Sequence, residues 1–289
     1  MNRRSFLQQT GLGILAMSTV KDFKDIFAAS KDSDSIMPVL FVGHGSPMNA
    51  IEDNEFSTGW MNVGKSLPKP KAILCVSAHW QTRGTMVTAM EKPQTIHDFG
   101  GFPKALFDKQ YPAPGSPEFA KETKELIKKT SVSLDEDWGL DHGTWSVLAR
   151  MFPNADIPTY QLSLDYTQPP EYHYELAKEL QELRKKGILI IGSGNIVHNL
   201  RMVRLEMPDG FDWAVEFDDK IRKALEERDH KSIIHYEDYG SIAKLSIPTN
   251  EHYLPLLYAI ALQQKNENLA FFNAKNLGGS ISMRSLIIH

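Results

Sequence analysis

The sequence is poor in cysteine and carries no excess of positive charge. Its single cysteine, Cys75, excludes an intrachain disulfide. Because Cys75 lies in the apolar run 72–76 with no basic neighbour, we expect a buried thiol rather than a nucleophile. The net charge is -4 and the basic residues form no stripe, so we expect no nucleic-acid partner.

The sequence also lacks an apolar run long enough to span a bilayer permanently. A twin-arginine motif, Asn-Arg-Arg-Ser-Phe-Leu, occupies residues 2–7, an apolar run follows at 11–20, and small residues at 28–30 suit a cleavage zone. We therefore predict a twin-arginine export signal at 1–30, a linker at 31–36, and a periplasmic protein without a membrane anchor. If the segment is instead an amphipathic helix of the mature domain, the protein is cytoplasmic.

Short apolar runs alternate with amphipathic helical patterns along residues 37–289. The strongest predicted strands are 38–43, 72–77 and 188–192, with weaker ones at 85–89, 159–164 and 280–287. The predicted helices are 117–129, 171–184, 211–227 and 252–264. This alternation predicts one α/β domain over 37–289, with a central, largely parallel or mixed sheet flanked by helices. The Pro- and Gly-rich stretch 93–117 is expected to form a long ordered loop.

Histidines follow the three strongest predicted strands. His44 comes directly after the first of them, His79 follows the second, and His198 follows the third. Ligands of open α/β sheets bind beyond the carboxyl ends of the strands, so these side chains should share one edge. A lone histidine is more often structural, but three with the same placement indicate a site for iron, zinc, copper or nickel.

Two further histidines have carboxylates beside them in the sequence. His252 follows Glu251 in the expected first turn of a helix, where neighbours point about 100° apart, so only one of the two should face the metal. His142 follows Asp141, which either raises its basicity or merely caps a helix. His97 belongs to the long loop and is expected at the mouth of a pocket. The other internal histidines are expected on the surface: His173, His230 and His235.

Six segments together carry a family resemblance: 40–48, 76–80, 95–103, 141–145, 194–200 and 251–257. At these residues the sequence resembles extradiol aromatic-ring-opening dioxygenases of the protocatechuate 4,5-dioxygenase catalytic-subunit type. Within that family it is most similar to bacterial 4,5-DOPA extradiol dioxygenase-like proteins. The segments occur in order from about residue 37 to the C-terminus. Two features depart from the nearer relatives: Asn250 in place of a proline, and the twin-arginine leader.

The resemblance implies one non-haem divalent metal per chain, with Fe(II) for activity or Zn(II) as bound. It implies that His44 and His79 are ligands and that His252 lies at the metal, with Glu251 as the alternative carboxylate ligand. His198 would be a further ligand or the catalytic acid and base. His142 would be an auxiliary proton donor or a hydrogen-bonding partner.

The resemblance also implies the reaction, which would open a catechol such as DOPA with O2 to give a muconic semialdehyde. Trp80, Trp145 and His97 would contact the substrate. The partners would be a small catechol and O2, in a monomer or a small homo-oligomer. The alternative function is a zinc-binding protein on the same scaffold without oxygenase activity, either a hydrolase or a binding module.

Overall fold

The computed structural model describes residues 16–17, 23–25, 36–204 and 206–289. The twin-arginine motif and the cleavage zone of the predicted export signal lie outside these residues, as does nearly all of the predicted linker. None of the described helices is long and apolar enough to cross a membrane.

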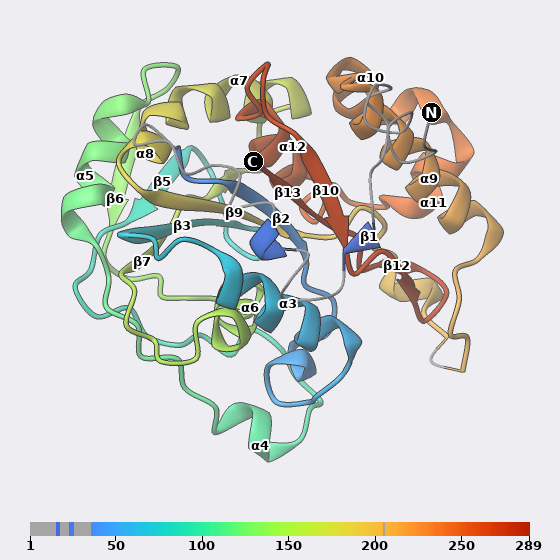
Figure 1. Cartoon of the computed structure of the whole chain (residues 1–289), viewed down its shortest axis with the longest axis horizontal. Helices are drawn as coiled ribbons and strands as arrows, with labels where there is room; N and C mark the ends of the chain where they lie inside the picture. The colour runs from blue at the N-terminus through green and yellow to red at the C-terminus, as the bar shows by residue number, and fades with distance from the viewer. Residues whose placement is uncertain (1–15, 18–22, 26–35, 205) are drawn as a thin grey trace, which may run out of the picture.

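A seven-stranded sheet forms the centre of the described structure (Figure 1). Its strands, in spatial order, are β1 (Ala16–Met17), β10 (Leu269–Phe272), β13 (Ser285–Ile288), β2 (Val39–Gly43), β9 (Ile188–Gly194), β3 (Ala72–Ser77) and β7 (Thr159–Gln161). The neighbours from β2 to β7 are parallel, whereas β13 is antiparallel to both β2 and β10. This confirms the predicted α/β class with a mixed central sheet.

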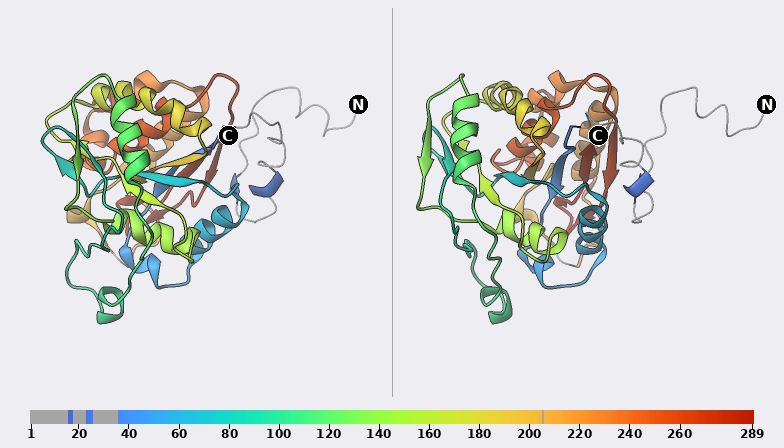
Figure 2. Two further views of the ribbon diagram at one scale, coloured as in Figure 1. Left: turned by 90° about the vertical axis from the view of Figure 1, so that its left-hand side faces the viewer. Right: turned by 60° about the vertical axis from the view of Figure 1, so that its left-hand side comes forward.

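Alternate residues of the central strands enter two separate hydrophobic cores. Val39 and Phe41 of β2 pack into one core, while Leu40 and Val42 pack into the other. Helices must therefore cover both faces, because each face of a parallel sheet presents apolar side chains. α12 and α8 contact β9 on one face, with α7 against α12, and α6 with α3 covers the other face (Figures 1 and 2).

The described helices include α3 (Glu55–Ser66), α4 (Lys104–Phe107), α5 (Pro117–Leu126), α6 (His142–Met151), α7 (Pro170–Ala177), α8 (Gln181–Lys185), α9 (Asp212–Glu227), α10 (His230–Ile234), α11 (Ser241–Ser246) and α12 (Leu254–Ala261). Short strand pairs lie outside the main sheet: β4 (Gln81–Thr82) with β8 (Leu164–Asp165), β5 (Thr85–Thr88) with β6 (Val132–Asp135), and β11 (Asn276–Leu277) with β12 (Ile281–Ser282).

Two predicted helices differ from the observed ones. The helix expected at 171–184 is interrupted by a 3-10 turn, Lys178–Leu180, between α7 and α8. The helix expected from residue 252 begins only at Leu254, so residues 251–253 form a turn. Pro255, in the first turn of α12, is the usual mark of a helix start and agrees with the observed boundary.

The long stretch 93–117 has little regular structure besides α4, which projects from one end of the molecule (Figure 2). It is nevertheless fixed to the body, because Gln94 and Ile96 exchange backbone hydrogen bonds with Leu140. The Tyr111 hydroxyl also donates to the carbonyl of Phe152. The expectation of an ordered loop is confirmed.

The surface placement predicted for His173 is wrong. This residue is completely buried, and its Nδ1 lies 3.0 Å from the hydroxyl of Tyr258. Because its neighbours in the sequence are mostly polar, the sequence did not indicate that His173 lies on the side of α7 that faces the interior. His235 is exposed as expected, whereas His230 is half-buried and contacts Tyr174.

Candidate metal centre

Parallel strand ends bring three of the predicted histidines to one edge of the sheet. β2, β9 and β3 are neighbours and run in the same direction, so the residues that follow them emerge together. His44 directly follows β2, His79 comes two residues after β3, and His198 comes four residues after β9.

Two glycines let the segments that carry His252 and His142 pack closely against the strand ends. Gly194 permits the approach of the His252 backbone, since a Cβ at Gly194 would lie only 2.1 Å from the carbonyl oxygen of His252. Gly143 permits the approach of α6, since a Cβ at Gly143 would lie 2.5 Å from Ser77 Oγ and 3.0 Å from the His79 ring. The N-terminus of α6 thus packs directly against the end of β3, and it brings His142 with it.

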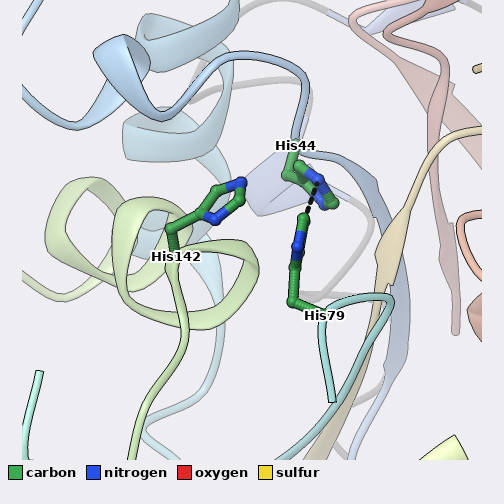
Figure 3. A group of neighbouring side chains, drawn as sticks. All are labelled: His44, His79 and His142. Carbon is green, nitrogen blue, oxygen red and sulfur yellow. Dashed lines mark hydrogen bonds between the residues drawn. The ribbon is translucent and has the colours of Figure 1, made fainter. Parts of the chain in front are cut away.

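The five histidines form one continuous cluster. His44 Nε2 and His79 Nε2 are 3.2 Å apart, and one nitrogen from each of His44, His79 and His142 lies within 4.8 Å of the others (Figure 3). Ligand atoms of His198, Glu251 and His252 form a second group of the same size. The two groups adjoin, since the His252 ring centroid lies 5.2 Å from that of His44 and 5.1 Å from that of His79. The His198 and His252 rings stack 3.4 Å apart.

The hydrogen bonds of Ser193 determine which nitrogen of His44 carries the proton. Ser193 Oγ donates its single hydrogen to the carbonyl oxygen of Gly143 at 2.5 Å. Toward His44 Nδ1, 3.1 Å away, the same oxygen can therefore only accept. His44 is protonated on Nδ1, and its Nε2 presents a lone pair.

Carboxylates hold two other rings in the same tautomer. Asp98 Oδ2 lies 3.2 Å from His79 Nδ1, and Glu251 Oε1 lies 2.9 Å from His252 Nδ1. Because an ionised carboxylate only accepts hydrogen bonds, His252 Nδ1 donates to Glu251 and its Nε2 retains a lone pair. The charge of Asp98 favours hydrogen on the nearby Nδ1 of His79. Such outer partners commonly orient the histidine ligands of metals.

This donor set fits a divalent metal ion. The Nε2 atoms of His44 and His79 face each other at 3.2 Å, so they can share one proton as a hydrogen bond or, when neither carries hydrogen, a cation. Two imidazoles on a tetrahedral ion, with N–metal bonds of about 2.0–2.1 Å, would place their nitrogens about 3.3 Å apart. The observed separation is close to that value.

Burial keeps four of the imidazoles neutral. It lowers the pKa of His44 and His252 well below the usual value, and neighbouring imidazoles lower it further. Burial, followed by the proximity of His142, lowers the pKa of His79 to about 3, and burial lowers that of His198 to about 4. These four imidazoles are therefore uncharged at neutral pH, as metal ligation requires. Burial tends to raise the pKa of Asp98, but hydrogen bonds from His142 and the nearby imidazoles lower it overall.

Asp141 has a structural position rather than a contact with the His142 ring. It caps α6 by accepting from the Thr144 backbone N–H, and its carboxylate also accepts from Ser77 Oγ and Gln161 Nε2. The carboxylate beside the His142 ring is instead Asp98, at 3.0 Å. Sequence reasoning missed this partner because it is 44 residues away along the chain.

The three predicted substrate residues lie around the cluster rather than in it. His97 Nε2 is 2.9 Å from the carbonyl oxygen of Lys109. Trp80 and Trp145 are 3% and 0% exposed, and the Trp145 indole donates to the carbonyl of Ile96. Their contact with a substrate stays a prediction. The half-buried Phe99, which the sequence analysis did not select, places its ring 5.5 Å from that of His142.

Comparisons with known proteins identify the family of this chain. Residues 38–275 match a family described as the catalytic LigB subunit of aromatic ring-opening dioxygenase. The chain is 46% identical over 270 residues to 4,5-DOPA dioxygenase extradiol of Escherichia coli K12, covering 92% of this chain and 98% of that protein. It is 36% identical over 258 residues to the Beta vulgaris protein of the same name, covering 87% and 96%. A crystal structure of an uncharacterised E. coli K12 protein superposes with a TM-score of 0.77 at 43% identity, covering 88% of this chain and all of that one (100%).

Proposed function

The chain belongs to the family of catalytic LigB subunits of aromatic ring-opening dioxygenases, and from that premise we propose that it opens a catechol such as DOPA with O2. The product is a muconic semialdehyde. The observation that carries the proposal is the close approach of the His44 and His79 Nε2 atoms within a cluster of buried, neutral imidazoles. The names of the relatives suggest DOPA as the first substrate to test.

His44, His79 and His252 are the proposed metal ligands, through their Nε2 atoms. We choose His252 over Glu251 as the third ligand because the two side chains are hydrogen-bonded, and this bond uses Glu251 Oε1 to hold the His252 ring. Thr249 Oγ1 donates to the same carboxylate oxygen, 3.0 Å away, and further fixes it. Glu251 is thus the group that orients the ligand.

The metal, when bound, supplies Lewis acidity that lowers the pKa of a catechol hydroxyl. The chain supplies the proton acceptors, because His198 and His142 flank the proposed ligands and the His198 ring is neutral. The half-buried Phe99 ring offers an apolar wall beside His142 for an aromatic substrate. Fe(II) is the proposed active metal. Zn(II) is the ion expected to be retained on purification, since zinc lies above ferrous iron in affinity for such ligands.

The role of His198 is decided by one substitution. If His198→Ala keeps the metal but loses turnover, His198 is the base, and if it loses the metal, His198 is a ligand. His230→Ala is a suitable control, since this histidine lies outside the cluster, against Tyr174.

Oxygen consumption tests the proposed reaction itself. Protein reconstituted anaerobically with Fe(II) is mixed with DOPA or another catechol in air-saturated buffer. We expect oxygen uptake and a yellow product. Tight zinc occupancy with no oxygen uptake on any catechol would instead favour a zinc-binding protein without oxygenase activity.

We also propose that the protein is periplasmic, exported by the twin-arginine signal at residues 1–30. The motif at residues 2–7 supports this proposal. Replacing both arginines, Arg3 and Arg4, with lysine should retain the protein in the cytoplasm of a bacterial host. An unchanged distribution on cell fractionation would contradict export by this route.

A further inference from the structure

One carboxylate oxygen of Asp98 contacts two histidines of the cluster. Asp98 Oδ2 lies 3.0 Å from His142 Nδ1 and 3.2 Å from His79 Nδ1. The other oxygen, Oδ1, accepts the backbone N–H of His142 at 2.9 Å. The side chain is only 18% exposed. The long loop 93–117 therefore supplies the group that links the end of β3 to the start of α6.

These contacts favour one tautomer in each ring. An ionised carboxylate has no hydrogen to donate, so Nδ1 of His142 donates to Asp98, and the carboxylate charge 3.2 Å from His79 Nδ1 favours hydrogen on that nitrogen too. A neutral imidazole carries only one N–H, so a ring with its hydrogen on Nδ1 presents a lone pair on Nε2. The lone pair of His79 then faces His44 Nε2, and the His142 ring is directed toward the same pair (Figure 3).

We propose that Asp98 is a positioning residue that fixes the orientation and tautomer of His79 and His142 through one shared oxygen. In this way it prepares His79 as a metal ligand and His142 as a proton acceptor at the same time. The roles given to these two histidines rest on the proposed function. The contacts of Asp98 with the two rings do not depend on it.

A purely structural role for Asp98 leads to different consequences. The N-terminus of α6 already has a capping residue, Asp141, which accepts from Thr144. If Asp98 only added to that cap, its removal would lower stability without altering the ring tautomers or the metal affinity.

The first test needs no variant. Long-range proton–nitrogen NMR of the metal-free wild type, labelled with 15N on histidine, reports which ring nitrogen carries hydrogen. We expect His79 and His142 to be protonated on Nδ1. Protonation of either ring on Nε2 overturns the proposal.

The second test uses Asp98→Asn. An amide presents an oxygen on one side only, so either the two rings or the His142 backbone N–H must face its NH2 group. Asp108→Asn is the matched control, because Asp108 lies in the same loop, is exposed, and pairs only with Lys104 among the ion pairs of the described residues. We expect Co(II) affinity, measured by competition with a chelator, to fall about 10- to 100-fold in Asp98→Asn. The Co(II) absorption spectrum should change as well, and the control should match the wild type.

Unchanged Co(II) affinity and spectrum in folded Asp98→Asn overturn the positioning role, even when the wild type opens catechols. If instead the wild type binds Co(II), shows the expected tautomers and opens no catechol, the proposed function fails while the role of Asp98 stands. Should Asp98→Asn not fold, the wild-type NMR experiment decides alone.

Discussion

Gly194→Ala should displace a proposed metal ligand without removing any polar group. The added Cβ would lie 2.1 Å from the carbonyl oxygen of His252, whereas ordinary contacts begin near 3.4 Å. Neither side yields easily, because Gly194 ends a central strand and the His252 carbonyl accepts the Asn195 N–H at 2.8 Å. The two backbones must therefore separate by about 1 Å.

A shift of that size exceeds the tolerance of a metal site, where ligand distances hold to about 0.2 Å. We expect metal affinity to fall at least about 10-fold and kcat/KM to fall about 100-fold, the usual cost of a 1 Å misplacement. Stability should fall by only about 1–3 kcal/mol, as for other overpacked sites, so the variant should fold.

The measurements are chelator competition for affinity, oxygen uptake for turnover, and urea unfolding for stability. Gly100→Ala is the matched control, since a Cβ there meets nothing within 4 Å and Gly100 has no positive φ. If Gly194→Ala binds metal and turns over within twofold of the wild type, the placement of His252 at the metal is refuted.

Three further predictions concern groups away from the metal. Burial lowers the pKa of His173 to about 4. As the pH falls below about 6.5, this histidine therefore binds a proton in the unfolded chain before it does so in the folded protein, and the stability present above that pH is lost. Urea unfolding of metal-free protein should show the wild type losing about 1–2 kcal/mol more than His173→Phe between pH 6.5 and 5, and equal slopes would contradict this. Glu267→Ala leaves the buried Arg184 guanidinium unpaired and should cost about 3–5 kcal/mol in the same assay, against less than about 1 kcal/mol for the exposed Glu182→Ala. Burial raises the pKa of the Cys75 thiol, so thiol reagents should label it only on unfolding, and rapid labelling of native protein would refute its burial.

Strands whose residues are all buried could be predicted from the sequence. β2, β3 and β9 are buried on both faces and therefore appear as short, continuous apolar runs. α6 was missed because nine of its ten residues are buried, which leaves no polar face and no helical period to detect. α3 was missed because its sequence is rich in serine, threonine, asparagine and glycine, and its start depends on a capping box at Asn54.

The residues of the candidate site likewise differ in how far the sequence could predict them. His44 and His79 could be placed because the end of a parallel strand fixes where the next residues lie. Asp98 and Ser193 could not, because their roles depend on contacts with residues distant in the chain. His142 was given only an auxiliary role, since the adjacent Asp141 caps the helix and the carboxylate that holds its ring comes from the loop.

An anomalous-scattering map from crystals of protein loaded with Co(II) tests the central claim most directly. We expect one ion between His44 and His79, about 2.0–2.2 Å from both Nε2 atoms, with His252 Nε2 also bound. An ion bound elsewhere, or none at this edge of the sheet in folded, Co(II)-saturated protein, would contradict the account.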